Sequence, residues 1–502
     1  MILSDLRRSA VRAAAANVLL AGLCFLVIAL ALRDVTTAPL SRDEAFSLRL
    51  ATMPWRLAWS GAVADAVHPP VFTMMLKLWI ALGGQSLLWL RLLPAIASCL
   101  LLAPFLLLME EFNISREAAV LALAALLANE TRLYYTHIFR SYPILALLSA
   151  LSIWLFARNS RTIQVTLPWS VAYCAVNLWM CWMHYFGLWV VGVQFLLALA
   201  VYRKELGRAV LSGAMVCASF LLWAPSLRIA SSRQSLDYYV GWMSRPTLGD
   251  LVWFYHALIG VPSRAMAHLV PVGFALFALP LLVWCVMAFR RPREMPAGGD
   301  RLLVHLLPYV TVPVLATFLL CQVGSVSLFA DRVLIFVVLP YCLLIAAAVT
   351  RIPVRPLRVG LSCALFVWTG CAAFAAAAKT PRSDTQWDVL TACLADPSGS
   401  PLPVRGVDPF MTWYYGEYLR ASGRPADYVA AVQSFRTAMP ERFWAEYYIF
   451  PAWPGYSAGL ASDLRAGGYA TVRRCSVPDS GGGSPLTVFD LESRDTATRA
   501  GF

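Results

Sequence analysis

Charged residues are scarce in this chain. Asp, Glu, Lys and Arg make up 14% of its 502 residues, hydrophobic residues make up 59%, and the mean hydropathy is +0.64. Soluble domains carry about a quarter charged residues, and an ordinary core could not hide this much apolar surface. The composition therefore excludes an ordinary soluble protein and predicts an α-helical protein that crosses a membrane many times.

Motifs for metal binding are also missing. The 12 cysteines form no Cys-x-x-Cys pair and no spacing with His that is typical of a zinc site. Most lie in or beside apolar runs, where a thiol acts as a small apolar side chain. Only Cys393 and Cys475 fall in a less apolar tail, and in an oxidising compartment this pair is a candidate disulfide.

Long apolar runs are what the chain does contain. About eleven segments approach the ~20 residues that a helix needs to cross ~30 Å of hydrocarbon. We expect them near 13–33, 88–108, 117–135, 139–157, 166–182, 184–201, 209–226, 270–289, 302–321, 333–350 and 357–378. A cleaved signal peptide is the alternative for the first run, but its length and the following Arg33-Asp34 favour an uncleaved anchor.

Basic residues mark one side of this topology. Arg7, Arg8 and Arg12 precede the first run, and the even-numbered gaps hold many of the other loop Lys and Arg residues. Because basic loops stay in the cytoplasm, we expect a cytoplasmic N-terminus and an extracytoplasmic segment after about residue 379. This topology explains much of the net charge of +13 without a nucleic-acid partner.

Two parts of the chain are expected outside the spans. The gap at 34–87 holds amphipathic stretches at Glu44–Met53, Trp55–Trp59 and Val71–Leu82, which suit the headgroup region. The tail at 379–502 is richer in turns and charge. We therefore expect a membrane domain over 1–378 and a small α/β domain over 379–502.

The α/β prediction for the tail follows from its local patterns. Strand-like runs occur at Leu402–Val407, Tyr469–Arg473 and Leu486–Leu491. Helical patches occur at Trp387–Leu394 and Tyr428–Thr437.

Conspicuous acidic, basic and aromatic residues gather on the outer side of the predicted topology. They include Asp43, Glu44, His68, Arg140, Tyr142 and Arg332. A carboxylate can take a proton from a hydroxyl nucleophile, and arginine can bind a phosphate through paired hydrogen bonds. Lys77, alone on an apolar stretch, also needs an anion or a route to water. This combination suits displacement at a carbon that bears a phosphate leaving group.

Short motifs at these positions resemble a known family. They are Ser41-Arg42-Asp43-Glu44-Ala45, His68-Pro69-Pro70-Val71-Phe72, Leu90-Arg91-Leu92-Leu93-Pro94, Tyr135 to Tyr142, His184-Tyr185-Phe186-Gly187 and Asp331-Arg332. In this order they resemble polyprenyl-phosphate-sugar-dependent glycosyltransferases of the GT-C fold. The resemblance is greatest to the protein-mannosyltransferase and aminoarabinose-transferase-like group.

The resemblance implies a glycosyltransferase of the bacterial cytoplasmic membrane that acts at the periplasmic face. A polyprenyl-phosphate sugar would be the donor, and a hydroxyl of lipid A, an envelope glycan or a protein would attack its anomeric carbon with inversion. Asp43 would be the general base and Glu44 its partner. Residues that bind the donor phosphate or substrate would be His68, Lys77, Arg140, Tyr142 and Arg332. Asp43 and Glu44 leave open a divalent cation, Mg²⁺ or Mn²⁺.

Each of these residues also has a plain structural explanation. Carboxylates are common in the first turn of a helix, and a residue before proline is often in a turn. Arg140 and Tyr142 are typical interfacial anchors, and Arg332 can pair with Asp331. A transporter or lipid flippase stays the alternative class, although its ionisable residues should lie near the midplane, where these spans are nearly free of charge.

Overall fold

The computed structural model describes most of the chain up to residue 378 and five short backbone segments beyond it. The described residues are 2–33, 35–36, 40–65, 68–162, 165–230, 243–261, 270–290, 299–324, 327–378, 404–406, 428–430, 442–448, 469–477 and 486–493. The chain divides into two compact units. The first unit contains Met1–Val35, Trp59–Leu236 and Arg245–Thr380, and the second contains Thr36–Ala58, Asp237–Ser244 and Pro381–Phe502.

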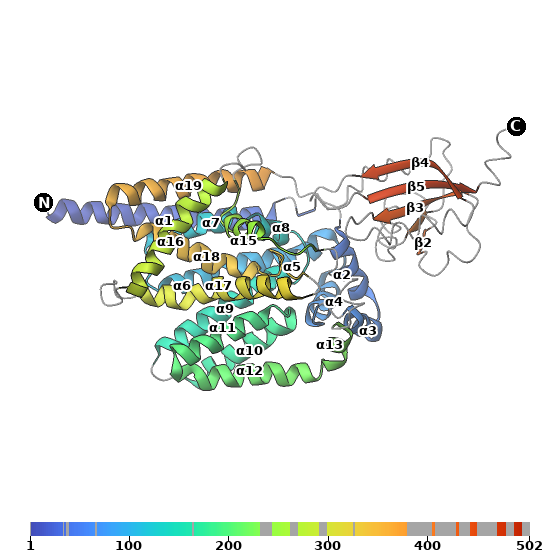
Figure 1. Cartoon of the computed structure of the whole chain (residues 1–502), viewed down its shortest axis with the longest axis horizontal. Coiled ribbons are helices and arrows are strands. Elements are labelled where there is room, and N and C mark those ends of the chain that lie inside the picture. Colours follow the sequence, from blue (N-terminus) through green and yellow to red (C-terminus); the bar gives the residue numbers. More distant parts are fainter. Residues whose placement is uncertain are drawn as a thin grey trace. The chain divides into compact units, whose positions relative to one another are not determined.

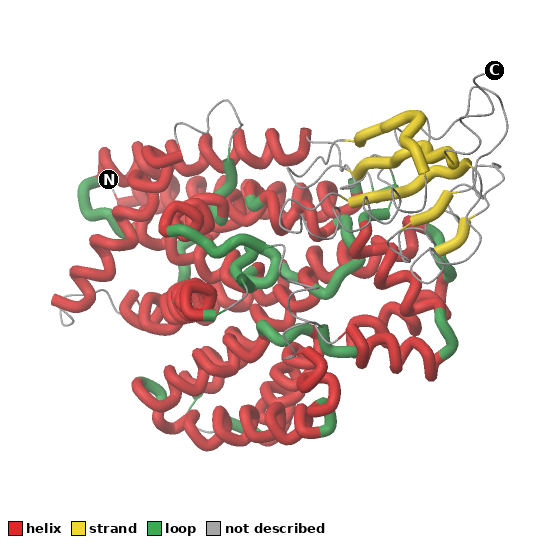
Figure 2. The backbone as a smooth tube through the Cα atoms, turned by 45° about the vertical axis from the view of Figure 1, so that its right-hand side comes forward, coloured by secondary structure: helices red, strands yellow, loops and turns green. Residues whose placement is uncertain are grey.

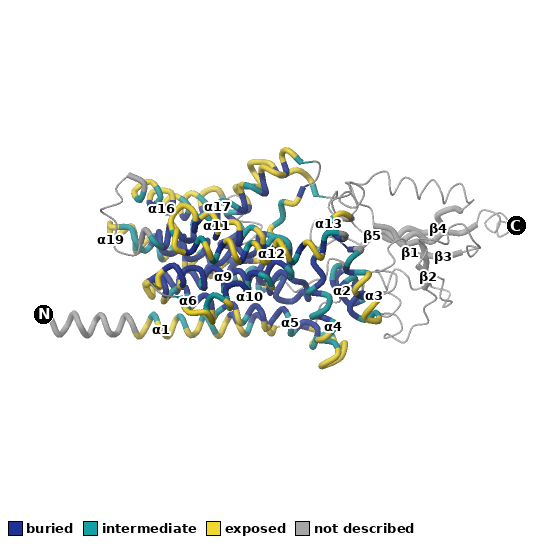
Figure 3. Tube along the Cα trace, turned by 90° about the horizontal axis from the view of Figure 1, so that it is seen from below, coloured by how far each residue is buried: buried dark blue, intermediate teal, exposed yellow. Residues whose placement is uncertain are grey.

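The first unit is a bundle of helices (Figure 1). Its helices are α1 (Ile2–Leu32), α4 (Val71–Gly83), α5 (Leu87–Leu100), α6 (Leu102–Glu111), α7 (Arg116–Ala128), α8 (Glu130–Thr136), α9 (Tyr142–Arg161), α10 (Leu167–Met183), α11 (Gly187–Ala200), α12 (Leu206–Leu221), α13 (Ala224–Ala230), α15 (Leu248–Ala257), α16 (Val270–Arg290), α17 (Gly299–Val323), α18 (Val338–Thr350) and α19 (Arg355–Ala378). In its core, α7 packs against α1, α18 and α19. The helix α9 is buried along most of its length, whereas residues 14–32 of α1 are mostly exposed or intermediate (Figure 3). The exposed apolar side chains of α1 include Phe25.

Six helical segments among the described residues are long and apolar enough to cross a membrane. They are Ala14–Leu32, Leu87–Glu111, Tyr142–Arg161, Pro271–Ala288, Arg301–Val323 and Arg355–Ala378. The other expected spans coincide with shorter helices, so the number eleven stays a prediction. One of them, expected at 117–135, is divided because the side chain of Asn129 accepts a hydrogen bond of 2.7 Å from the Arg132 N–H and starts α8.

Helices also form in the expected outer gap. They are α2 (Arg42–Thr52), α3 (Trp55–Asp65) and α4. A pair of indoles joins α4 to α5: the Nε1–H groups of Trp79 and Trp89 each donate to the other residue's carbonyl at 2.7 Å, and the rings stack at 4.3 Å. Gly83 permits this contact, because a Cβ there would lie 2.1 Å from the Trp89 ring.

Buried polar groups connect four helices of the first unit. Ser152 of α9, Asn177 of α10, Gln194 of α11 and Ser212 of α12 are all fully buried. Asn177 Nδ2 donates to Ser212 Oγ at 2.9 Å, and Gln194 Nε2 donates to Ser152 Oγ at 2.7 Å. Ser152 Oγ in turn donates to Asn177 Oδ1, so the polar groups satisfy one another away from water.

The described strands of the second unit form one mixed sheet (Figure 2). The strands are β1 (Val404–Gly406), β2 (Tyr428–Ala430), β3 (Arg442–Tyr448), β4 (Tyr469–Val477) and β5 (Leu486–Ser493), in the order β2-β1-β3-β5-β4. β1 pairs in parallel with β2 and β3, and the pairs β3–β5 and β5–β4 are antiparallel.

One local prediction for this unit was wrong. The segment starting at Tyr428 was expected to be helical, but Tyr428–Ala430 is a strand, because it pairs in parallel with Val404–Gly406 and its aromatic and β-branched residues suit a strand. The helical patch expected at Trp387–Leu394 lies outside the described residues. So do Cys393 and the side chain of Cys475, which leaves the disulfide a prediction.

Candidate functional site

Five side chains of the first unit meet where several helices end. Asp65 is the last residue of α3, and His68 lies just before Pro69 and Pro70, which lead into α4. Arg140 lies between α8 and α9, Tyr142 begins α9, and His184 follows α10. We call Asp65, His68, Arg140, Tyr142 and His184 the histidine–arginine cluster.

His68 is the centre of this cluster. Its Nδ1 lies 3.1 Å from Asp65 Oδ2, and its Nε2 lies 3.2 Å from Arg140 Nη2. Asp65 and Arg140 are buried, whereas the side chain of His68 is 20% exposed. The cluster thus holds a carboxylate, an imidazole and a guanidinium in contact, with the imidazole open to a ligand.

His184 lies beneath these groups and is neutral. Its ring centroid is 5.6 Å from those of both His68 and Tyr142, and its Nδ1 accepts a hydrogen bond from the Phe186 N–H at 3.2 Å. Burial, together with the charges of the nearby Arg140 and Arg332, holds the pKa of His184 well below its ordinary value. The neutral ring therefore carries its proton on Nε2 and is a hydrogen-bond donor there.

The structure brings several predicted residues together. His68, Arg140 and Tyr142 belong to the histidine–arginine cluster, and Arg332 lies close enough for its charge to act on His184. Next to Arg332, the Asp331 carboxylate accepts hydrogen bonds from the Arg332 N–H at 2.8 Å and from the Thr131 hydroxyl of α8 at 2.5 Å. Lys77 lies half-buried near the middle of α4, and its role stays a prediction.

The two predicted catalytic carboxylates lie in the first turn of α2, in the second unit. Ser41 caps this helix: its Oγ accepts from the Glu44 N–H at 3.3 Å, and Glu44 Oε2 accepts from the Ser41 N–H at 2.9 Å. This reciprocal pair is a capping box. Glu44 is buried and Asp43 is half-buried, so the two neighbours differ in their access to solvent.

The described residues offer no group of three or more His, Cys, Asp and Glu side chains that could hold a metal ion. Asp43 and Glu44 are two adjacent carboxylates, and one oxygen of Glu44 is already bonded to the Ser41 N–H. A divalent cation at this pair would therefore need further oxygen ligands, which a substrate phosphate or water can supply. Whether a divalent cation binds at Asp43 and Glu44, a question that the sequence left open, is a matter for experiment.

Sequence reasoning gave too little weight to two members of the cluster. Asp65 precedes His68 by three residues, and His184 begins a His-Tyr-Phe motif. The motif was a usable signal for His184. The signal for Asp65 was only its place in the same outer gap as His68, and it received no role because a single acidic residue is usually solvated.

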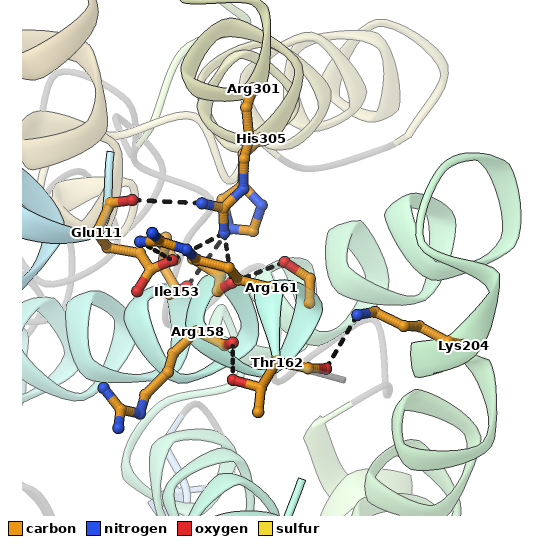
Figure 4. A network of polar contacts seen from close by, with 10 residues as sticks. Glu111, Ile153, Arg158, Arg161, Thr162, Lys204, Arg301 and His305 are labelled. Atoms are coloured by element: carbon orange, nitrogen blue, oxygen red, sulfur yellow. Dashed lines mark hydrogen bonds and ion pairs between the residues drawn. The ribbon is translucent and has the colours of Figure 1, made fainter. Parts of the chain in front are cut away.

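A second polar network lies at the opposite end of α9 (Figure 4). Arg301 of α17 donates to Glu111 Oε1 of α6 at 2.9 Å and to the Ala157 carbonyl of α9 at 2.7 Å. Lys204 donates to the Thr162 carbonyl at 3.0 Å. Arg301 neutralises the buried Glu111, and Arg301 and Lys204 donate hydrogen bonds to carbonyl groups near the end of α9. The network therefore has a structural explanation, since it connects neighbouring helices.

Comparisons with known proteins identify the fold. The sequence matches no protein-family model and no curated protein. The structure is similar to ArnT from Cupriavidus metallidurans in the apo state, with a TM-score of 0.55, 13% identity and coverage of 95% of this chain and 98% of that chain. It is also similar to the same protein bound to undecaprenyl phosphate, with a TM-score of 0.53, 13% identity and coverage of 94% and 97%.

An archaeal oligosaccharyltransferase, AglB from Archaeoglobus fulgidus, matches at a TM-score of 0.45 and 11% identity over 81% of this chain and 64% of that one. The similarity to ArnT, which extends over nearly the whole of both chains, confirms the GT-C fold that the sequence motifs implied.

Proposed function

We propose that this protein is a membrane glycosyltransferase that moves a sugar from a polyprenyl-phosphate donor to a hydroxyl acceptor. The observation that carries the proposal is the histidine–arginine cluster, in a chain whose fold is that of ArnT. ArnT has been solved with undecaprenyl phosphate, a lipid of the class proposed here. The proposed acceptors are lipid A, another envelope glycan or a protein, at the periplasmic face of the bacterial cytoplasmic membrane.

The cluster has the chemistry that a lipid phosphate needs. Arg140 supplies a permanent positive charge with several N–H donors, and His184 supplies a neutral N–H donor. Arg332 adds a second permanent charge near His184. Together they would bind the phosphate of the donor and stabilise the charge that grows on it as the sugar leaves.

Asp43 is the proposed general base. Its carboxylate is half-buried in the first turn of α2, and it would take the proton of the acceptor hydroxyl as that oxygen attacks the anomeric carbon. In-line attack opposite the phosphate gives inversion. Glu44, whose carboxylate closes the capping box, would hold this first turn in place, and Lys77 and Tyr142 are proposed to contact substrate.

Replacement of Asp43 by Asn tests this assignment. The variant keeps the size of the side chain but cannot accept the proton, so we expect transfer to fall about 10²-fold to 10⁴-fold. Transfer is measured with purified protein in lipid vesicles that contain a polyprenyl-phosphate sugar, with binding of undecaprenyl phosphate as the control. We expect this binding to stay within about threefold of wild type, because phosphate contacts are intact.

Two outcomes would contradict the proposal in different ways. Near-normal sugar transfer by Asp43→Asn would show that Asp43 is not the general base. Movement of the lipid-linked sugar between membrane leaflets, without transfer to any hydroxyl, would favour the flippase alternative. Repeating the assay with a chelator decides whether a divalent cation takes part.

A further inference from the structure

The contacts of His68 define which of its ring nitrogens carries a proton. Arg140 only donates hydrogen bonds, and an ionised Asp65 carboxylate only accepts them. With Arg140 Nη2 at 3.2 Å from Nε2 and Asp65 Oδ2 at 3.1 Å from Nδ1, only the neutral ring protonated on Nδ1 satisfies both contacts. A doubly protonated ring would point an N–H at the guanidinium. His68 is therefore a neutral acceptor for Arg140 in this structure.

Groups from several elements act on this ring. Asp65, at the end of α3, favours the protonated imidazole, whereas Arg140, before α9, disfavours it. His184, after α10, is kept neutral by burial and by the nearby positive charges, including that of Arg332, which lower its pKa. Tyr185 faces Asp65 and is uncharged. Among the described residues, the Asp65 carboxylate and the Arg140 guanidinium are the charged groups within hydrogen-bond distance of the His68 ring.

Sugar transfer changes the charge that this site must hold. A polyprenyl-phosphate sugar is a phosphodiester with one negative charge. The product is a phosphate monoester, whose second pKa near 6 gives it a charge of about −1.5 to −2 at neutral pH. A site with fixed charges cannot match both lipids equally well.

We propose that Asp65 and His68 form a proton-coupled clamp for the product phosphate, an inference that rests on the function proposed above. When the monoester binds, its oxygens replace His68 Nε2 as the acceptor for Arg140. His68 then takes up one proton from solvent at Nε2 and donates this new N–H to a phosphate oxygen. No covalent bond to the phosphate forms or breaks in this step.

Asp65 is the positioning residue of the clamp. Its carboxylate holds the Nδ1–H of His68 in both states and stabilises the imidazolium, so its own charge never changes. Because the diester carries a single charge, the combined charge of Arg140, Arg332 and Asp65 already compensates it, and His68 stays neutral. The clamp therefore distinguishes the product, polyprenyl phosphate, from the donor, polyprenyl-phosphate sugar, by the difference in their charge.

Calorimetric titration of the full-length protein in lipid nanodiscs tests the clamp. The probes are undecaprenyl phosphate and its methyl ester, which keeps a single charge. Titrations at about pH 7.5, where an ordinary imidazole is mostly neutral, are repeated in two buffers with different ionisation enthalpies to count the protons bound. We expect about 0.5 to 1 proton taken up with undecaprenyl phosphate, and close to none with the methyl ester.

Three variants separate the roles. His68→Gln keeps an acceptor for Arg140 but cannot be protonated, so proton uptake should vanish. Asp65→Asn should lower the uptake and weaken binding of undecaprenyl phosphate about tenfold, because it removes a charged hydrogen-bond partner of the imidazolium, with little effect on the methyl ester. Asp65→Glu keeps the carboxylate and should restore the uptake, which a merely structural role of Asp65 would not explain.

The outcomes are distinguishable. If the wild-type protein binds neither lipid, the proposed function fails. If it binds both with equal proton uptake, or if His68→Gln takes up as many protons as wild type, the clamp is wrong and the proposed function stands. The comparison of the two lipids on the wild-type protein is decisive even where a variant does not fold.

Discussion

At the scale of single residues, two adjacent carboxylates have different tasks. Glu44 is buried and its Oε2 accepts the Ser41 N–H, so it holds the start of α2. Asp43, one residue earlier, is half-buried. A buried, hydrogen-bonded carboxylate is fixed in place, whereas a partly exposed one can meet a substrate and exchange its proton. This contrast favours Asp43 as the base and Glu44 as the residue that positions its turn.

Glu44→Gln tests this division. The amide oxygen of Gln can still accept the Ser41 N–H, so we expect thermal stability in detergent close to wild type and transfer reduced by less than about tenfold. Glu44→Ala loses the bond from the Ser41 N–H, one of the two bonds of the capping box, and should destabilise the protein by about 1 kcal/mol. A stable Glu44→Gln protein as inactive as Asp43→Asn would instead place Glu44 in the chemistry or at a cation.

The sequence predicted part of the candidate site at this scale. His68, Arg140 and Tyr142 were selected because each lies at the edge of an apolar run, and the structure brings all three into one cluster. The contact of Asp65 with His68 depends on three-dimensional geometry that no residue pattern specifies. His184 was undervalued because a single His beside an apolar run is usually structural.

At the scale of elements, apolar runs predicted where helices lie better than where they end. The expected outer-gap helices correspond to α2, α3 and α4. The run at 117–135 looked continuous, but hydropathy does not register that Asn129 caps α8 and also donates to the Leu258 carbonyl at 3.3 Å. The strand at Tyr428–Ala430 depends on a partner strand more than 20 residues away, so local periodicity misassigned it.

Two glycines with a positive φ give a test of helix packing. Gly84 and Gly260 have φ of 85° and 83°. A Cβ at Gly84 meets nothing within 4 Å, whereas a Cβ at Gly260 would lie 2.4 Å from the Ala128 carbonyl of α7 and 2.8 Å from Ala372 of α19. We expect Gly84→Ala to cost about 1–3 kcal/mol, because its φ of 85° with ψ of −162° is a conformation that essentially only glycine adopts, and Gly260→Ala to cost more than Gly84→Ala because a steric clash adds to the strain of the positive φ.

Thermal denaturation of both variants in one detergent measures the difference. Gly84→Ala is the control, since it shares the positive φ and lacks the clash. Equal losses of stability would mean that the segment after α15 can move away from α7 and α19.

At the scale of the whole molecule, the fold is conserved in shape with little identity. The chain and ArnT are similar over 95% and 98% of their lengths at 13% identity. Lipid-facing positions require only that the side chain be apolar, so many different sequences are compatible with the same arrangement of helices. The general class was therefore readable from composition, whereas the sugar and the acceptor depend on a few side chains that composition does not reveal.

The predicted orientation can be tested on the intact chain. An odd number of spans with a cytoplasmic N-terminus puts residue 502 outside. We expect alkaline phosphatase fused after Phe502 to be active, and green fluorescent protein fused at the same point to be dark. A fluorescent fusion without phosphatase activity would mean an even number of spans and a cytoplasmic tail. Fusions after Arg161, in a basic gap, are the control with the opposite pattern.

The buried hydrogen bonds among α9, α10, α11 and α12 have a consequence for biogenesis. Asn177 and Gln194 each carry polar groups that lipid cannot satisfy, and their partners lie on helices that are synthesised before and after them. Until α12 leaves the ribosome with Ser212, one donor of Asn177 has no such partner. We therefore expect the insertion machinery to release these helices into the lipid together, after α12 has been synthesised. A nascent chain that ends before α12 should be degraded by membrane quality control.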